Sequence, residues 1–189
     1  MSMVKEPDFL AAEFHFKQFL ESLGLDLQFE HLRETPRRVV KAYKEFLSGY
    51  SQKPEDVIKV QFSEENYNQM IIVKDIPFVS LCAHHLVPFS GVATVGYIPR
   101  DGKITGLSKL ARVVEMYARR LQIQERLTNQ VAQAIQNALN PIGVGVRIEA
   151  VHECMTIRGI QKPGTATVTS CLIGAFLEEP ETRAEFLSL

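Results

Sequence analysis

The sequence is poor in cysteine, in long apolar runs and in net charge of either sign. Its 189 residues include only three cysteines. No apolar stretch is long enough to span a bilayer, and no apolar run with a cleavage site stands at the N-terminus. We therefore expect a cytoplasmic protein in a reducing compartment, where disulfides are rare.

The charge balance also narrows the choice of partners. The formal net charge is -1, so nothing in the overall composition suggests binding to nucleic acid, and any anion site must be local. A hydrophobic content of 46% and this length fit one well-cored soluble domain with a small accessory segment. There is no internal repeat and no low-complexity segment.

Hydrophobic periodicity divides the chain into three parts. We predict an N-terminal helical segment over residues 1–50, a polar connecting loop over 51–69 and a catalytic domain over 70–189. The expected helices cover residues 9–23, 35–47, 108–121, 124–139 and 182–187. The expected strands cover residues 70–73, 76–79, 92–98, 144–154 and 165–172, with a turn at 99–102.

The segment from Cys82 to His85 is the strongest candidate for chemistry. Cys82 and His85 offer a thiolate and an imidazole three residues apart, and a distant second thiolate, Cys154, would give three zinc ligands and an open fourth position. In an extended strand Cys82 would share a face with His84 instead, so the chain must turn here. His84 is then free to handle protons beside the metal. The alternative is that each of these residues is simply packed in the core.

The second half of this site lies on an alternating segment. Residues 144–154 alternate between apolar and other side chains as far as Cys154. If that strand is unbroken, His152 and Cys154 face the same way. Cys171 is interpreted as a small buried residue, because nothing near it in the sequence completes a ligand set.

Two helix starts carry pairs of cations. Thr35, followed by a proline, opens a helix that bears Arg38 and Lys41 on one face, which is either a solvated basic face or a phosphate contact. Ser108 stands in the N-cap position of a later helix whose beginning carries Lys109 and Arg112. Free amide donors and added cations make that helix start a good receptor for a phosphate chain.

Glu125 lies at the start of another predicted helix. A carboxylate there is commonly only a favourable charge at the positive end of the helix dipole. It can also accept two N–H donors from the edge of a base, and guanine offers N1–H together with its 2-amino group. Both interpretations stay open on this evidence.

Four motifs occur in order along the chain and together closely resemble GTP cyclohydrolase I, a zinc enzyme of pteridine synthesis. The similarity runs from about Thr35 to the C-terminus. The motifs are Cys82-x-His84-His85, Gly106-Leu107-Ser108-Lys109-Leu110-Ala111-Arg112, Gln122-x-Gln124-Glu125-Arg126-Leu127-Thr128 and His152-x-Cys154-Met155-x-x-Arg158-Gly159.

The resemblance implies an α+β tunnelling fold, in which an antiparallel sheet carries helices on one face and is preceded by N-terminal helices. It also implies a homodecamer of two pentamers with active sites between subunits. The implied zinc ligands are Cys82, His85 and Cys154, and the implied proton-handling pair is His84 and His152. The implied substrate contacts are Gln124 and Glu125 for guanine, and Arg38, Lys41, Ser108, Lys109, Arg112 and Arg158 for the triphosphate.

The implied reaction is hydrolysis of GTP at C8 of the guanine, giving formate and 7,8-dihydroneopterin triphosphate for tetrahydrofolate synthesis. One alternative is that the same reaction feeds 7-deazaguanine synthesis. Another is a catalytically weak GTP-binding or scaffold homologue, because Ala83 stands where the family usually has Glu. The region before Thr35 also lacks the family's usual acidic, glycine-containing lead-in, so no role is carried over there.

Overall fold

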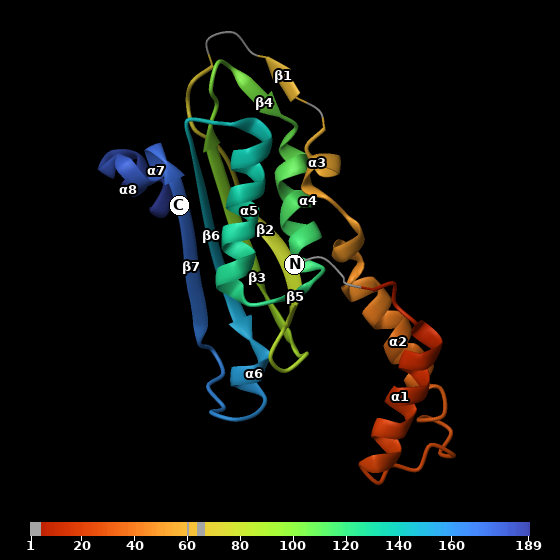
Figure 1. Ribbon diagram of the computed structural model, residues 1–189. Coiled ribbons are helices and arrows are strands. Elements are labelled where there is room, and N and C mark those ends of the chain that lie inside the picture. Colours follow the sequence, from red (N-terminus) through yellow and green to blue (C-terminus); the bar gives the residue numbers. More distant parts are fainter. Residues whose placement is uncertain (1–4, 60, 64–66) are drawn as a thin grey trace.

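The computed structural model describes residues 5–59, 61–63 and 67–189, and it confirms the predicted α+β class (Figure 1). The predicted connecting loop therefore lies partly outside the described residues. The helices are α1 (Phe9–Ser22), α2 (Thr35–Phe46), η1 (Ser48–Ser51), α3 (Pro54–Val57), α4 (Leu107–Ala118), α5 (Gln124–Leu139), α6 (Glu153–Thr156), α7 (Ala175–Glu178) and α8 (Pro180–Leu187). The strands are β1 (Gln61–Ser63), β2 (Ile71–Cys82), β3 (Pro88–Ile98), β4 (Lys103–Thr105), β5 (Leu121–Gln122), β6 (Gly143–His152) and β7 (Ala166–Gly174).

A five-stranded sheet forms the body of the molecule, with strand order β5-β2-β3-β6-β7. The pairs β2–β3, β3–β6 and β6–β7 are antiparallel, and β5 adds a short parallel pairing beside the end of β2. The long helices α4 and α5 pack on one face of this sheet (Figure 1). The predicted arrangement of an antiparallel sheet with helices on one face is confirmed.

Along β3 and β6, alternate side chains point toward α4 and α5, so the core lies between the sheet and these two helices. Alternate side chains of both strands are fully buried, as are the helix residues that meet them. Burying each valine, leucine or isoleucine side chain among them stabilises the fold by about 1.5–3 kcal/mol relative to exposure. The sheet residues concerned are Ala93, Val95, Tyr97, Val144, Val146 and Ile148, and those of the helices include Leu110, Val114, Leu127 and Val131.

Several predicted boundaries differ from the structure. The two short strands predicted over 70–73 and 76–79 are one strand, β2, whose register shifts between Val73 and Ile76, where Asp75 takes a positive φ of 55°. The N-caps are Glu34 and Gly106, one and two residues before the predicted Thr35 and Ser108. The strand predicted over 144–154 ends at His152, and Cys154 lies in the short helix α6.

The N-terminal helices α1 and α2 pack against each other and project from the body (Figure 1). Gly49, just after α2, anchors this segment to the end of α4: its N–H donates to Arg119 O, and its carbonyl accepts from Arg120 Nε. A Cβ at Gly49 would lie 2.0 Å from Met116 O, so only glycine allows this approach. The predicted connecting segment, residues 51–69, includes the helix α3 and the strand β1, which pairs with β4.

Candidate metal centre and active site

The predicted turn after Cys82 is present and is held by backbone hydrogen bonds. The Leu86 N–H donates to Cys82 O at 2.8 Å, and the Cys82 N–H donates to Val87 O at 2.9 Å. Leu86 takes a positive φ of 57°, which reverses the chain into β3. The Ala83 N–H donates to Gln122 O at 2.8 Å, so β5 supports the turn from the side. The turn is thus fixed by backbone contacts, whatever the metal content.

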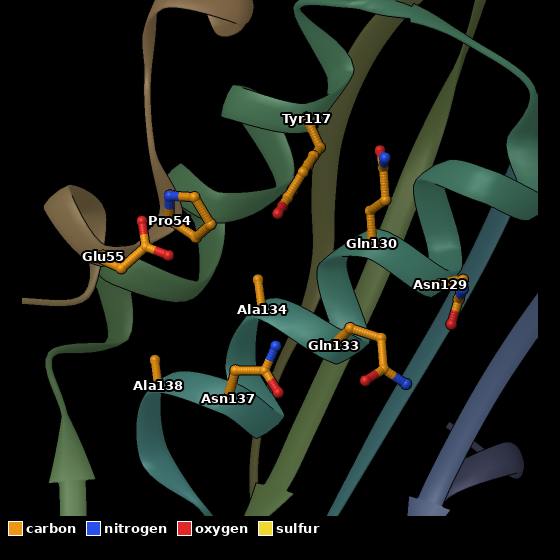
Figure 2. Close-up of a pocket in the computed structure, with 9 residues that line it drawn as sticks. All are labelled: Pro54, Glu55, Tyr117, Asn129, Gln130, Gln133, Ala134, Asn137 and Ala138. Carbon is orange, nitrogen blue, oxygen red and sulfur yellow. The ribbon is translucent and has the colours of Figure 1, made fainter. Parts of the chain in front are cut away.

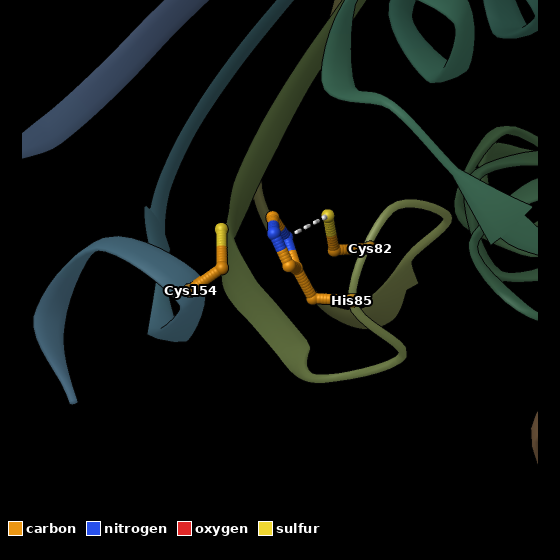
Figure 3. Close-up of side chains that lie close together, drawn as sticks. All are labelled: Cys82, His85 and Cys154. Atoms are coloured by element: carbon orange, nitrogen blue, oxygen red, sulfur yellow. Dashed lines mark hydrogen bonds between the residues drawn. The ribbon is translucent and has the colours of Figure 1, made fainter. Parts of the chain in front are cut away.

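The turn and α6 bring the three predicted metal ligands together. One ligand atom from each of Cys82, His85 and Cys154 lies within 4.8 Å of the other two, and Cys82 Sγ is 4.0 Å from His85 Nδ1. Figure 3 shows the three side chains pointing into the same space, with the His85 ring between the two sulfur atoms in that view.

These separations and donor types fit a zinc ion. Tetrahedral zinc with the usual Zn–S and Zn–N bond lengths needs ligand atoms about 3.6–3.8 Å apart, so the side chains must draw together by about 1 Å at most. Thiolate and imidazole ligands suit zinc better than they suit magnesium or calcium. Three ligands from the protein leave a fourth position open, which is the pattern of catalytic zinc sites.

The pKa of the Cys154 thiol is shifted by its surroundings. Burial, followed by the adjacent Cys82, raises the pKa of the Cys154 thiol, whereas the Arg158 guanidinium lowers it. The Cys154 thiol is therefore difficult to ionise unless a cation lies beside it. A divalent metal removes this difficulty, because it binds both sulfurs as thiolates.

His84 lies beside the three ligands but outside their set. Its Nδ1 is 3.8 Å from Cys82 Sγ, and its ring is exposed. The His84 and His85 ring centroids are 6.2 Å apart and nearly perpendicular. This placement is compatible with a proton-handling role, which stays a prediction.

His152 occupies the last position of β6 and is held on two sides. Its ring stacks on Phe89, with centroids 4.6 Å apart, and its Nε2 lies 2.7 Å from Gln124 Oε1. Burial lowers the pKa of His152, and the nearby Glu125 carboxylate opposes that shift. Glu125 itself is exposed in the first turn of α5, close enough to the centre to act on His152.

Gln124, predicted to contact guanine, is buried with only 2% of its surface exposed. Its amide nitrogen lies 3.1 Å from Ile148 O, 2.9 Å from Thr167 O and 3.2 Å from Thr169 Oγ1. Its substrate role stays a prediction, and these contacts favour a different one. Sequence reasoning missed this because the partners come from β6 and β7, far from Gln124 along the chain.

The predicted triphosphate residues are spread over three places. Arg158 follows α6 and acts on Cys154, so it lies near the metal ligands. Arg38 and Lys41 are exposed on α2. Ser108 and Lys109 lie in the first turn of α4 and Arg112 in the next, and this helix begins beside β4, at the end of the sheet away from the Cys82 turn (Figure 1).

A separate cavity of about 230 Å³ lies on the outer side of α5. Amide side chains line it together with Tyr117 and Glu55 (Figure 2). None of its lining residues belongs to the predicted site. It is therefore distinct from the candidate metal centre.

Comparison with known proteins gives consistent matches. The family model described as GTP cyclohydrolase I matches residues 12–189. A protein of Synechococcus sp. (strain JA-3-3Ab) named GTP cyclohydrolase 1 is 56% identical over 170 residues, covering 90% of this chain and 74% of its own. The protein of that name from Dehalococcoides mccartyi (strain CBDB1) is 53% identical over 174 residues, covering 92% of each chain.

A relative from Dictyostelium discoideum, also named GTP cyclohydrolase 1, is 56% identical over 173 residues and covers 92% of this chain and 74% of its own. Among solved structures, the apo form of the archaeosine synthase QueF-Like matches with a TM-score of 0.46 and 21% identity. That match covers 56% of this chain and 93% of the other.

Proposed function

Because the chain belongs to the GTP cyclohydrolase I family and is a hydrolase of that kind, we propose that it converts GTP into formate and 7,8-dihydroneopterin triphosphate in a zinc-dependent reaction. The observation that carries this proposal is the grouping of Cys82, His85 and Cys154 within 4.8 Å. No helix of the described chain combines the length and the apolar character that a membrane crossing needs. We propose that the enzyme works in the cytoplasm.

In the proposed mechanism, Cys82, His85 and Cys154 hold the zinc ion. When bound, zinc supplies Lewis acidity and lowers the pKa of a coordinated water towards neutrality. The hydrogen bonds of the turn hold the backbone of Cys82 and His85. Zinc binding therefore needs adjustment of side chains and little rearrangement of the backbone there.

The two histidines outside the ligand set are the proposed proton carriers. An imidazolium gives its proton to N7 of the purine while water adds at C8, and the second, neutral histidine accepts the proton that this water loses. The C8–N9 bond then breaks, N9 takes up that proton, and the five-membered ring of the base is open. A second hydrolysis releases C8 as formate, and the ribose then rearranges and closes the new ring. His152 is the better-held of the two, because Phe89 and Gln124 restrain its ring. His84 is exposed and can exchange protons with solvent.

Glu125 is the proposed acceptor for guanine. Its carboxylate is exposed at the start of α5, near His152, and can accept N1–H and the 2-amino group together. Arg158, which acts electrostatically on Cys154, is proposed to bind the triphosphate with the other predicted cations and Ser108. Contacts far from C8 then hold the base over the metal, which assists the reaction there.

We propose that each active site is completed by a second subunit of a homodecamer. Ser80, two residues before Cys82, donates a hydrogen bond to Ala118 O at the end of α4. A helix rises about 1.5 Å per residue, so Lys109 at the start of α4 lies roughly 14 Å further along the helix axis. If Ser108, Lys109 and Arg112 hold the triphosphate, this distance favours their belonging to a neighbour's site.

Two surfaces support an assembly. Among the described strands, β7 pairs only with β6, and β2 pairs along its outer edge only with the two residues of β5. Open edges of this kind can continue a sheet into a neighbouring subunit. The helix α1 also exposes several large apolar side chains, namely Leu10, Phe14 and Phe19, each more than half exposed.

The proposed activity is tested by incubating the zinc-loaded protein with GTP. We expect formate release together with a pterin product that fluoresces after oxidation. Absence of both signals from fully zinc-loaded protein would reject the proposed reaction. The pathway served, tetrahydrofolate as we propose or 7-deazaguanine, is tested by the neighbouring genes, because both pathways begin with the same product.

Ala83 favours one alternative, a weak catalyst that mainly binds GTP. Ala83 lies between two residues of the centre, and its methyl group offers no charge to orient a ligand or a nearby cation. This alternative predicts GTP binding with little turnover and a clear gain of activity in Ala83→Glu. Substantial turnover in the natural sequence, with no gain in Ala83→Glu, supports the main proposal instead.

A further inference from the structure

The orientation of the Gln124 amide is fixed by its surroundings. Two backbone carbonyls, Ile148 O and Thr167 O, lie within 3.1 Å of one terminal atom. Carbonyl oxygens only accept hydrogen bonds, so this atom must be the amide nitrogen. The other terminal atom, 2.7 Å from His152 Nε2, is therefore the carbonyl oxygen Oε1.

A pair of threonines agrees with this orientation. Thr128 Oγ1 donates to Gln124 O at 2.7 Å and lies 2.7 Å from Thr169 Oγ1. Since the Thr128 proton is committed to Gln124 O, the Thr169 hydroxyl donates to Thr128 and accepts from the Gln124 amide nitrogen. The donor and acceptor roles in this buried group are therefore mutually consistent.

The orientation of Gln124 decides the tautomer of His152. Because Oε1 can only accept, the His152 nitrogen facing it must carry a hydrogen, and that nitrogen is Nε2. The stacked Phe89 ring, whose plane is 1° from that of His152, restrains the imidazole from tilting away. In the neutral ring, Nδ1 is consequently the unprotonated nitrogen.

We propose that Gln124 is a positioning residue for the reaction, which holds His152 as the Nε2–H tautomer so that Nδ1 is the nitrogen that exchanges a proton with the purine. The inference rests on the proposed function, because it acts through His152. In the proton transfer, the Nδ1–H bond of the imidazolium breaks, its electron pair stays on Nδ1 and the proton passes to N7. The neutral ring that remains keeps its hydrogen on Nε2, where Gln124 Oε1 accepts it throughout.

This role differs from direct recognition of guanine by Gln124. The amide has two hydrogens and already faces three protein acceptors, so no N–H donor is left for the base. A buried amide that loses its partners costs about 1–3 kcal/mol, which opposes its turning toward a ligand. Glu125 alone then remains as the side-chain acceptor for guanine on this helix turn.

The kinetic test compares Gln124→Leu with Gln130→Leu. Gln130 lies on the same helix and accepts a hydrogen bond from Gln122, whereas the amide that contacts His152 is that of Gln124, so Gln130→Leu controls for loss of an amide from α5. For Gln124→Leu we expect kcat to fall by about 10-fold to 100-fold, with the KM for GTP and the zinc content nearly unchanged. For the control we expect little change in any of the three. A rise in KM with unchanged kcat would overturn the proposal in favour of direct substrate binding.

A double-mutant cycle tests whether the effect passes through His152. Once His152→Ala has removed the imidazole, adding Gln124→Leu should lower kcat no further. Independent, additive losses would overturn the positioning role. If the natural protein itself shows no turnover, the proposed function is rejected. Failure of the positioning role and failure of the proposed function therefore give different results.

The tautomer of His152 can also be determined by NMR spectroscopy, without a variant of Gln124 and without measuring turnover. In zinc-loaded protein labelled with ¹⁵N in the histidine rings, at a pH well above the ordinary histidine pKa, His152 should show a protonated Nε2 and an unprotonated Nδ1. The signal is assigned by its disappearance in His152→Ala. A protonated Nδ1 would contradict the proposal even if Gln124→Leu failed to fold.

Discussion

Phe89 and His152 stack face to face across neighbouring strands, with ring centroids 4.6 Å apart and planes 1° from parallel. The two residues are directly paired in the β3–β6 register, and Phe89 is fully buried. A rigid aromatic ring of the core therefore sets the plane of a histidine at the edge of the candidate metal centre. The hydrophobic core and the proposed proton chemistry meet at this contact.

We predict that Phe89→Leu lowers kcat more than its effect on stability explains. The change should cost about 1–2 kcal/mol of folding stability and let the His152 ring rotate. Phe78→Leu is the matched control, because Phe78 is also buried and contacts Phe89 edge-on. Thermal unfolding and steady-state kinetics of both variants check this prediction, and equal kcat values in the two would contradict it.

We predict that Cys154→Ser loses both zinc and activity. The substitution removes one of three ligands, and a serine hydroxyl is a poor replacement for a thiolate at zinc. Cys171→Ser is the control, because Cys171 is also half-buried but lies in β7, with Asn129 as its hydrogen-bond acceptor. Elemental analysis should show zinc in the control and none in Cys154→Ser, and zinc retained by both would remove Cys154 from the metal centre.

His84→Ala should keep its zinc and lose turnover. His84 lies near Cys82 but outside the three ligands that group within 4.8 Å, so its removal should leave the metal in place. Loss of a general acid or base typically lowers a rate by about 10²–10⁴-fold. Zinc content and formate release are measured on the same sample, and zinc loss equal to that of Cys154→Ser would overturn this division of roles.

Arg112→Ala should mainly weaken GTP binding. A hydrogen bond to a charged group contributes about 1.5–3 kcal/mol, so the KM for GTP should rise by about 10-fold or more. Arg37→Ala is the control, because Arg37 is an exposed arginine already paired with Glu34. Unchanged Michaelis behaviour of Arg112→Ala would remove this residue from the triphosphate site.

The part of the candidate metal centre that lies in one segment of the chain, Cys82 and His85, could be predicted from the sequence. A spacing of three residues between Cys82 and His85 can hold one ion only if the chain turns, and the structure contains that turn. The position of Cys154 was predicted on the wrong element, since the alternation of residues 144–154 does not show where the backbone leaves the sheet. The strand ends at His152, and α6 turns Cys154 toward the cluster.

The support of His152 could not be predicted in the same way. Gln124 is adjacent to Glu125 in sequence, which suggests that both contact guanine. The Gln124 amide is instead buried among backbone carbonyls of β6 and β7. Such contacts depend on strand register and helix packing, which no local pattern encodes. The predicted N-caps, Thr35 and Ser108, lie one and two residues after the observed ones. The exact first residue of a helix depends on backbone geometry, which a sequence pattern places only to within one or two residues.

The central claim is that one zinc ion held by Cys82, His85 and Cys154 is required for hydrolysis of GTP at C8. Zinc is added stepwise to metal-free, reduced protein, and formate release is measured at each ratio of zinc to chain. The account predicts no formate without zinc and a rate that grows in proportion to zinc until each chain holds one ion. Formate release by metal-free protein, or none from fully loaded protein, would contradict it.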